Sequence, residues 1–180
     1  AAMSGYSGCA AYNDFRELVA REDIDAVTVA SPGHWHGVHS LAALRAGKDV
    51  FCEKPLTRTI VEGRMLVDTV RRYQRVLQTG TQQRSDGRFR LACNLARCGY
   101  LGKLHTVEVA APGPKYQPRY TGPTTPEPVP DGFDYEMYLG PAPAKPYTRY
   151  RIDWPGWYLI WDYCAGFIVN WGVHPLDIAN

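Results

Sequence analysis

The sequence has no apolar run long enough to cross a membrane. A spanning helix needs roughly 20 consecutive, mostly apolar residues, and the 180-residue chain contains no such stretch. The first residues also lack the charged and then apolar pattern of a secretory signal peptide. We therefore expect a soluble protein without a membrane partner.

An excess of charge of one sign is also missing. The 20 Lys and Arg residues nearly balance the 18 Asp and Glu residues, the formal net charge is +2, and the basic residues are scattered. Nucleic acids and anionic lipids are bound by concentrated basic surfaces. The composition therefore favours neither partner.

Cysteine is scarce, and its spacing is uninformative. The five cysteines form an odd set without a short paired spacing, which argues against a disulfide framework and a zinc site; they are Cys9, Cys52, Cys93, Cys98 and Cys164. We expect mostly buried thiols. His34, His36 and His39 lie close together, but no neighbouring Cys or carboxylate completes a ligand set, so we predict no metal.

Strand and helix patterns alternate through the first half of the chain. A helix is expected at about 13–21, a strand at 25–31, a helix at 36–46 and a strand at 49–53. A third helix then begins at the capping box of Thr59 and Glu62 and leads to a strand at 76–79. This order predicts an α/β fold with a partial Rossmann-type, doubly wound parallel sheet. Ligands bind outside the carboxyl ends of such strands.

The pattern changes after a helix expected at about 88–98. Residues 104–110 alternate like a half-exposed strand, ten of the 14 prolines fall between Pro112 and Pro146, and four of the five tryptophans follow residue 150. The proline-rich arm either reaches a neighbouring subunit or forms a surface loop. We expect the second half of a dinucleotide-binding domain at 1–86, a connecting helix at 87–99, and part of a sheet-containing α+β domain at 100–180.

Both ends of the sequence look cut, because the first helix leads directly to a mid-sheet strand and a helix begins near Pro175 with no room to finish. We expect a piece of a longer protein that lacks a glycine-rich phosphate-binding turn before Ala1 and a C-terminal region after Asn180. We expect a cytoplasmic protein, or a periplasmic one if an export signal precedes Ala1.

The run Glu53-Lys54-Pro55 carries the most specific chemistry. It stands at a strand end, where a proline restricts the preceding lysine to an extended conformation and can adopt a cis bond. The lysine amine can then reach a substrate. Taken alone, the triplet also fits a solvated strand end.

With its surroundings, this run resembles the Gfo/Idh/MocA oxidoreductases, the group of glucose-fructose oxidoreductase and inositol dehydrogenase. The resemblance covers nearly the whole chain and is carried by four stretches in the same order and spacing: Ile24-Asp25-Ala26-Val27, Ser31-Pro32 with His36, Ala46-Gly47-Lys48 through Pro55, and Gly166 through His174 to Asp177.

The resemblance implies an NAD(P)-dependent enzyme that transfers a hydride from a sugar or polyol hydroxyl carbon. It implies that Lys54 and His174 are catalytic, and that a small set of residues lines the NAD or NADP cofactor: Ser31, Pro32, His36, Glu53 and Lys54. A histidine suits proton transfer near neutral pH, although a histidine before a proline is commonly a packing residue. A homo-oligomer is expected for the full-length protein.

Two positions depart from the family pattern: Asn170 replaces an aspartate, and Gly33 replaces a polar residue. Asparagine cannot accept a proton, so base duty passes to His174 or Lys54, or the chemistry differs from simple oxidation. Candidate substrate residues are Arg84, Trp161, Asn170 and Asp177. The aromatic residues at 154–163 either stack on sugar rings or pack a core.

Two other functions stay open. The first is a glycosidase or lyase of the same family that oxidises a sugar transiently with tightly held NAD, eliminates a substituent and reduces the sugar again; Asn170 keeps it open. The second is a non-catalytic cofactor-binding protein.

Overall fold

The first half of the chain folds as strand–helix–strand units. The computed structural model describes residues 8–110 and 125–180, so part of the proline-rich arm lies outside the described residues. The elements up to residue 97 are the helices α1 (Phe15–Val19), α2 (Gly33–Arg45), α3 (Ile60–Tyr73) and α4 (Gly87–Arg97), the 3-10 turn η1 (Gln82–Ser85), and the strands β1 (Ala26–Val29), β2 (Asp49–Glu53) and β3 (Leu77–Gly80).

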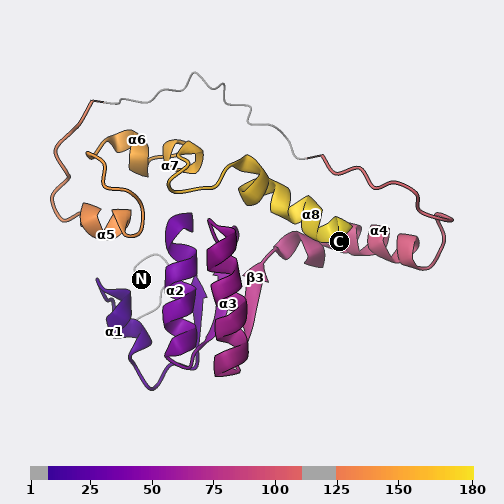
Figure 1. Ribbon diagram of the computed structural model, residues 1–180, viewed down its shortest axis with the longest axis horizontal. Coiled ribbons are helices and arrows are strands. Elements are labelled where there is room, and N and C mark those ends of the chain that lie inside the picture. The colour runs from indigo at the N-terminus through magenta and orange to yellow at the C-terminus, as the bar shows by residue number, and fades with distance from the viewer. Residues whose placement is uncertain (1–7, 111–124) are drawn as a thin grey trace.

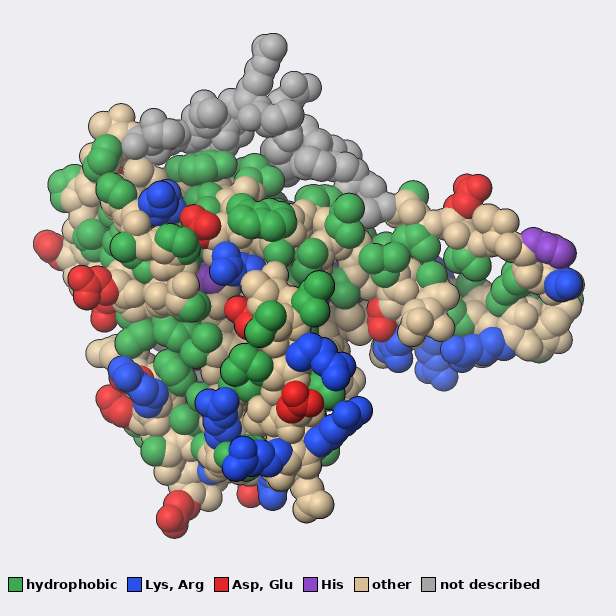
Figure 2. Space-filling view, viewed as in Figure 1, with side chains coloured by type: hydrophobic (Ala, Val, Ile, Leu, Met, Phe, Trp, Pro, Cys, Tyr) green, Lys and Arg blue, Asp and Glu red, His purple; other side chains and the backbone are tan. Residues whose placement is uncertain are grey.

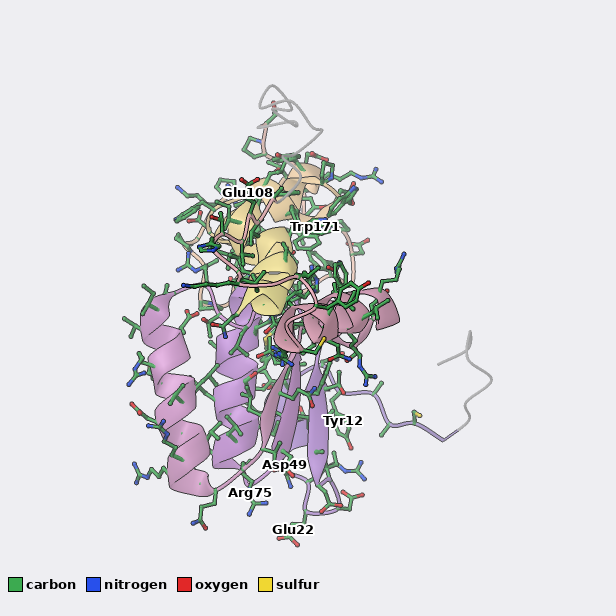
Figure 3. All side chains as sticks on the ribbon, turned by 90° about the vertical axis from the view of Figure 1, so that its right-hand side faces the viewer. Tyr12, Glu22, Asp49, Arg75, Glu108 and Trp171 are labelled. Atoms are coloured by element: carbon green, nitrogen blue, oxygen red, sulfur yellow. The ribbon has the colours of Figure 1, made fainter. Side chains whose placement is uncertain are left out.

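The three strands form one parallel sheet in the order β1-β2-β3. Helices α2 and α3 lie side by side on the same face of this sheet (Figure 1; Figure 3). Two crossovers of one hand that advance in one direction across a sheet place both helices on one face. The expected parallel α/β architecture is confirmed for this part of the chain.

The core of this layer lies between the sheet and the two helices. It is built from buried apolar side chains of β1, α2, β2 and α3: Val29, Leu41, Ala43, Leu44, Val50, Cys52 and Leu66. Burial on the two faces of β2 differs, because Cys52 is fully buried whereas Phe51 on the other face is 37% exposed. Burial also differs along β1, since Ala26 and Thr28 are exposed whereas Val29 is buried.

Helix α3 is capped as the sequence predicts. The Thr59 hydroxyl accepts a hydrogen bond from the Glu62 N–H, and the Glu62 carboxylate accepts one from the Thr59 N–H. Arg71 and Arg72 lie in its last turn, where cations complement the negative helix end. On the face of the molecule that Figure 2 shows, Lys and Arg side chains gather in the lower part.

The second half of the described chain is helical. It contains α5 (Tyr135–Leu139), α6 (Arg149–Ile152), α7 (Gly156–Leu159), the π-helical turn η2 (Ile168–Gly172) and α8 (Val173–Ala179). A second buried cluster of mainly aromatic residues, including Tyr135, Tyr147 and Tyr163, holds α5 to the segments around α6 and α7. These elements lie above the carboxyl ends of the strands, while α8 lies against α4 (Figure 1).

One expectation for the second half is wrong. Residues 104–110 form no strand and their side chains are exposed; a strand forms by pairing its backbone groups with a neighbouring strand, and among the described residues none lies alongside. The described residues after 100 contain helices and no strand. The division of the chain into domains, with part of an α+β domain at 100–180, stays a prediction.

The cysteines also differ from expectation. Cys52 and Cys164 are buried, but Cys9 and Cys98 are exposed and Cys93 is intermediate. Among the described helices, none has the length and apolar character needed to span a bilayer. Within the same residues, no three His, Cys, Asp or Glu side chains gather in a way that holds a metal ion.

Candidate functional site

A cavity of about 360 Å³ lies at the carboxyl ends of β1 and β2, under the second half of the chain. The strand ends and the start of α2 supply Ala30, Ser31, Gly33, His36, Glu53, Lys54 and Pro55; the second half supplies Trp154, Trp157, Tyr158, Cys164, Asn170 and Trp171. Trp171 lies above the strands, whereas Asp49, at the start of β2, lies at the opposite end of the sheet (Figure 3). The cavity stands where a parallel sheet binds its ligands.

Lys54 reaches across this cavity. Its backbone N–H donates to the Glu53 carboxylate over 3.2 Å, and its Nζ donates to Oδ1 of Asn170 over 2.8 Å. The Lys54–Pro55 peptide bond is cis. The two side chains come from positions 116 residues apart. The fold therefore brings the end of β2 and the π-helical turn η2 into contact.

The orientation of Asn170 follows from its two partners. An ammonium group only donates hydrogen bonds, so the amide oxygen must face Lys54. The amide nitrogen then faces Cys164 and donates to its Sγ over 3.2 Å. Asn170 is 3% exposed and Cys164 is 2% exposed. This chain of contacts presents a neutral oxygen to the lysine amine, where the family pattern has a carboxylate.

His174 is buried close to the same group. It is 4% exposed, and its Nδ1 has no hydrogen-bond partner among the described residues. Burial lowers the pKa of His174, the positive charge of Lys54 lowers it further, and Glu53 and Asp177 act in the opposite direction. The lowered pKa favours the neutral imidazole near neutral pH, and this is the form that accepts a proton.

The helix around His174 differs from expectation. Helical backbone begins at η2 and continues without a break into α8, so His174 does not stand at a free helix N-terminus. The side chain of Pro175 is tolerated all the same, because the π-helical turn before it changes the hydrogen-bond pattern that an interior proline would break.

Glu53 and Gly80 meet at the ends of β2 and β3, where they are register partners. A Cβ atom at Gly80 would lie 3.1 Å from the Glu53 carboxylate. Glycine therefore leaves room for this carboxylate to turn back toward the Lys54 backbone. A glycine at position 33 has a similar reason, because a Cβ there would lie 3.2 Å from the Tyr163 carbonyl oxygen and a larger side chain would crowd this carbonyl group.

The predicted cofactor residues separate in the structure. Ser31, His36, Glu53 and Lys54 line the cavity described above. Pro32 instead lines a neighbouring cavity of about 580 Å³ between α1, α2 and α5. The Ser31 hydroxyl lies 3.0 Å from Nδ1 of His39, and both ring nitrogens of His36 lie 2.7 Å from backbone carbonyl oxygens.

Aromatic side chains form the upper wall of the cavity. Trp154 is 59% exposed, and its ring lies 6.0 Å from that of Trp157 and 5.1 Å from that of Tyr158. Tyr158 is 7% exposed, its hydroxyl has no hydrogen-bond partner among the described residues, and burial raises its pKa to about 12. The wall therefore offers flat apolar faces and one protonated hydroxyl.

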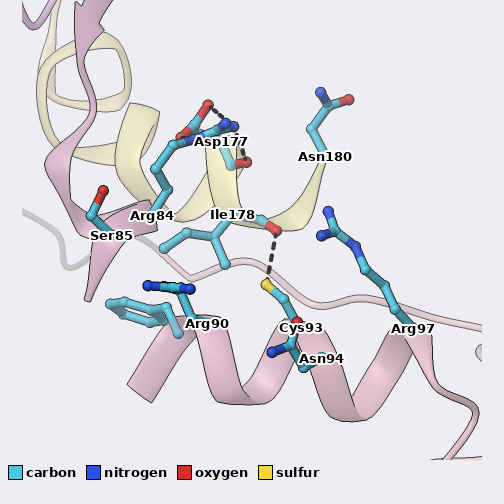
Figure 4. A pocket seen from close by; sticks show the side chains of 10 residues that line it. Arg84, Ser85, Arg90, Cys93, Asn94, Arg97, Asp177, Ile178 and Asn180 are labelled. Atoms are coloured by element: carbon cyan, nitrogen blue, oxygen red, sulfur yellow. Dashed lines mark hydrogen bonds and ion pairs between the residues drawn. The ribbon is translucent and has the colours of Figure 1, made fainter. Parts of the chain in front are cut away.

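Three predicted substrate residues lie elsewhere. Trp161 is 70% exposed and is not part of the cavity lining. The Arg84 guanidinium binds the Asp177 carboxylate over 2.6 and 2.8 Å and lowers its pKa. This pair lines a separate cavity of about 420 Å³ between η1, α4 and α8 (Figure 4). Asn170 is the predicted substrate residue that the structure brings to Lys54.

The sequence analysis missed Cys164. Its contact with Asn170 orients the amide, but no motif or spacing distinguishes it from the other four cysteines. A buried cysteine usually behaves as a small apolar residue, so its role is visible only in the structure.

Two family models match the chain. Residues 2–81 match the model described as "Oxidoreductase family, NAD-binding Rossmann fold", and residues 94–180 match "Oxidoreductase family, C-terminal alpha/beta domain". The chain belongs to the Gfo/Idh/MocA oxidoreductase family. The resemblance drawn from the sequence is thereby confirmed.

Individual relatives match over part of their length. Myo-inositol 2-dehydrogenase of Thermotoga maritima is 31% identical over 108 residues, which cover 60% of this chain and 32% of that protein. Glycosyl hydrolase family 109 protein 1 of Shewanella sp. is 33% identical over 96 residues, 53% of this chain and 21% of that protein. The crystal structure of myo-inositol 2-dehydrogenase from Lactobacillus plantarum aligns with a TM-score of 0.49 and 29% identity, covering 51% of this chain and 27% of that one. The chain thus spans about a third of the length of the first of these curated relatives.

Proposed function

We propose that the chain is part of an NAD-dependent dehydrogenase that oxidises a secondary hydroxyl of a cyclic polyol or sugar. The observation that carries this proposal is the 2.8 Å contact between Lys54 Nζ and Asn170 Oδ1, inside a cavity at the carboxyl edge of the sheet and beside the neutral His174. The match to an NAD-binding Rossmann family and the relatives that are named inositol dehydrogenases support it.

The residues of the cavity suit a cofactor and a hydroxylated substrate. The unpartnered, buried Tyr158 hydroxyl is a donor that a ligand would satisfy, and Lys54 spends one of its three donors on Asn170. Glu53 and Ser31 would lie along the nicotinamide end of the cofactor. NAD, when bound, supplies the acceptor for the hydride that leaves the substrate carbon.

The protein's own groups then handle orientation and the hydroxyl proton. Lys54 donates a hydrogen bond to the reacting oxygen, and Asn170 holds the lysine amine in place by accepting a hydrogen bond from it. As the C–H bond gives up its hydride, the O–H proton passes to the neutral imidazole of His174, which leaves a carbonyl product. Trp154 and Trp157 offer their faces to the apolar face of the ring.

The test uses the full-length gene product with a panel of inositols and hexoses. We expect NADH formation, read at its absorbance, with at least one cyclic polyol, and a fall in kcat on the order of 10²- to 10⁴-fold in Lys54→Ala. The matched control is Lys103→Ala, because Lys103 is exposed and lies outside the cavity. A Lys54→Ala variant with wild-type turnover would refute the assignment; a protein that binds NADH but turns over nothing would be the non-catalytic binding protein.

A second function is favoured by one observation. Asn170 replaces the expected carboxylate and its oxygen is already fixed on Lys54, and one relative is named a glycosyl hydrolase. We propose as the alternative a glycosidase or lyase cycle that oxidises and re-reduces the sugar. Aryl glycosides discriminate the two: release of the phenol without a net change in NADH absorbance identifies the alternative, whereas stoichiometric NADH identifies the dehydrogenase.

The choice between NAD and NADP stays open. The other finer assignments stay predictions: a homo-oligomer, a cytoplasmic or periplasmic compartment, and substrate contacts for Arg84, Trp161 and Asp177.

A further inference from the structure

His36 occupies an unusual place beside the proposed reaction centre. It lies on the first turn of α2 and is 3% exposed. Its Nδ1 lies 2.7 Å from the carbonyl oxygen of Pro55, and its Nε2 lies 2.7 Å from the carbonyl oxygen of Ser31. The ring therefore joins the segment after β2, which carries Lys54, to the segment after β1.

The Pro55 segment has few other anchors. Residues 54–59 form neither helix nor strand, and a proline has no N–H, so its carbonyl is its one backbone hydrogen-bonding group. The side chain of Pro55 lies against the start of α2, 3.8 Å from a Cβ built at Gly33. Helix α2 thus contacts Pro55 with both its backbone surface and the His36 ring.

Both nitrogens of His36 point at the backbone. Each faces a carbonyl oxygen 2.7 Å away, and a neutral ring donates to one of the two, so neither nitrogen is directed at the polar groups of a ligand. This distinguishes His36 from Lys54 and Tyr158, which line the same cavity and keep unused hydrogen-bonding capacity.

We propose that His36 is a positioning residue: through the Pro55 carbonyl it fixes the segment that aims Lys54 at Asn170, rather than contacting the cofactor. The inference rests on the proposed dehydrogenase function. A catalytic amine must be placed closely, because a misplacement of about 1 Å costs on the order of 10²-fold in rate.

Three variants of the full-length enzyme separate the two contacts. In His36→Asn the amide nitrogen stands near the place of Nδ1 and can donate to Pro55, whereas in His36→Gln it stands near the place of Nε2 and can donate to Ser31. We expect kcat to fall on the order of 10- to 100-fold in His36→Ala and His36→Gln, and to recover largely in His36→Asn.

The affinity for NADH, measured by fluorescence titration, should change by no more than about twofold in all three variants. His34→Asn is the matched control, because His34 is a buried histidine of the same helix that instead bonds the Tyr138 carbonyl oxygen, 2.7 Å away. We expect its kcat to stay within about twofold of wild type. Wild-type kcat in His36→Ala, or a loss of NADH affinity in step with kcat, would overturn the proposal.

A crystal structure of His36→Ala decides the question without any turnover. We expect the contact between Lys54 Nζ and Asn170 Oδ1, 2.8 Å here, to be broken; an unchanged contact would overturn the positioning role. If the wild-type enzyme oxidises no polyol or sugar, the proposed function fails. The crystal structure of His36→Ala would still support or refute the positioning role of His36.

Discussion

At the scale of single residues, the chain Lys54–Asn170–Cys164 sets the chemistry of the cavity. Sequence patterns located Lys54, because strand ends and prolines leave local signals, and the family resemblance located Asn170 and His174. Their convergence is now visible in the 2.8 Å contact and in the electrostatic effect of Lys54 on His174. Cys164 and Tyr158 acquire their roles from contacts between distant segments, and these leave no periodic signal in a single sequence.

The base role of His174 predicts a specific pH profile. Burial and the charge of Lys54 lower its pKa below the ordinary value of 6.5, and only the neutral imidazole accepts the substrate proton. We expect kcat/KM for oxidation to be level near pH 7.5 and to fall as the pH drops through this lowered pKa. His174→Gln should lose this acidic limb and on the order of 10²- to 10⁴-fold in rate.

The profile is measured as initial NADH formation between about pH 5 and 8. The matched control, His105→Gln, changes an exposed histidine outside the cavity and should keep the wild-type profile. The same acidic limb in His174→Gln would contradict the assignment of His174 as the base.

At the scale of elements, local sequence signals worked where the structure is local. Strand β2 coincides with the expected 49–53, and the capping box of α3 is formed as predicted. Helix α2 begins at Gly33 instead of His36, with Pro32 in a non-helical conformation as its N-cap. The strand expected at 104–110 fails because alternation describes a strand's two faces but not the partner that must pair with it.

The docking of α5 on α2 depends on a glycine. At Gly140, the residue after α5, a Cβ would lie 2.1 Å from the Trp35 ring, and the φ angle is +47°. The Trp35 indole N–H donates to the Met137 carbonyl oxygen over 3.0 Å, so the ring is tied in place. We expect Gly140→Ala to lower the free energy of unfolding by about 2–4 kcal/mol through overpacking and backbone strain.

The control for this prediction is Gly132→Ala. Gly132 also has a positive φ angle, +77°, but a Cβ there meets nothing within 4 Å, so the substitution carries the backbone strain alone. Chemical denaturation of both variants measures the difference. If both variants lost the same free energy of unfolding, the Trp35 ring would have moved aside without a measurable loss of stability, which would contradict the prediction.

At the scale of the whole molecule, two packed clusters meet along the first turn of α2. One lies between the sheet and its helices, and the other holds the aromatic residues of the second half. His34 and Trp35 of α2 bond the carbonyl oxygens of Tyr138 and Met137 across this boundary. His34 and the neighbouring His39 therefore lie at or beside the boundary between the two clusters, outside the lining of the candidate cavity.

This arrangement predicts a loss of stability in mild acid. Burial lowers the pKa of His34, and it lowers that of His39 to about 4. Both groups bind protons less readily in the folded state than in the unfolded state. Their stabilising effect is therefore fully present above about pH 6.5 and is lost as the pH falls from there toward 4. We expect the denaturant concentration at the midpoint of unfolding to decrease as the pH is lowered from about 7.5 to about 5.

The variant His39→Gln should flatten this dependence. Its ring stacks on Trp35 with centroids 4.6 Å apart, so some stability is lost at every pH, but the slope against pH should decrease. Ion-paired carboxylates do not contribute in this window, because the pKa of Asp86, for example, is lowered to about 2. An unchanged slope in His39→Gln would exclude His39 as a source of the acid sensitivity.

The cavity draws one wall from residues 30–55 and the other from residues 154–171. During synthesis, the sheet and its two helices, which end by Gly80, emerge from the ribosome roughly 75 residues before the aromatic wall, which begins at Trp154. The growing chain therefore carries its lysine without the asparagine that receives it. The cavity can therefore bind a ligand only late in synthesis, when residues 154–171 have joined the sheet and helices made earlier.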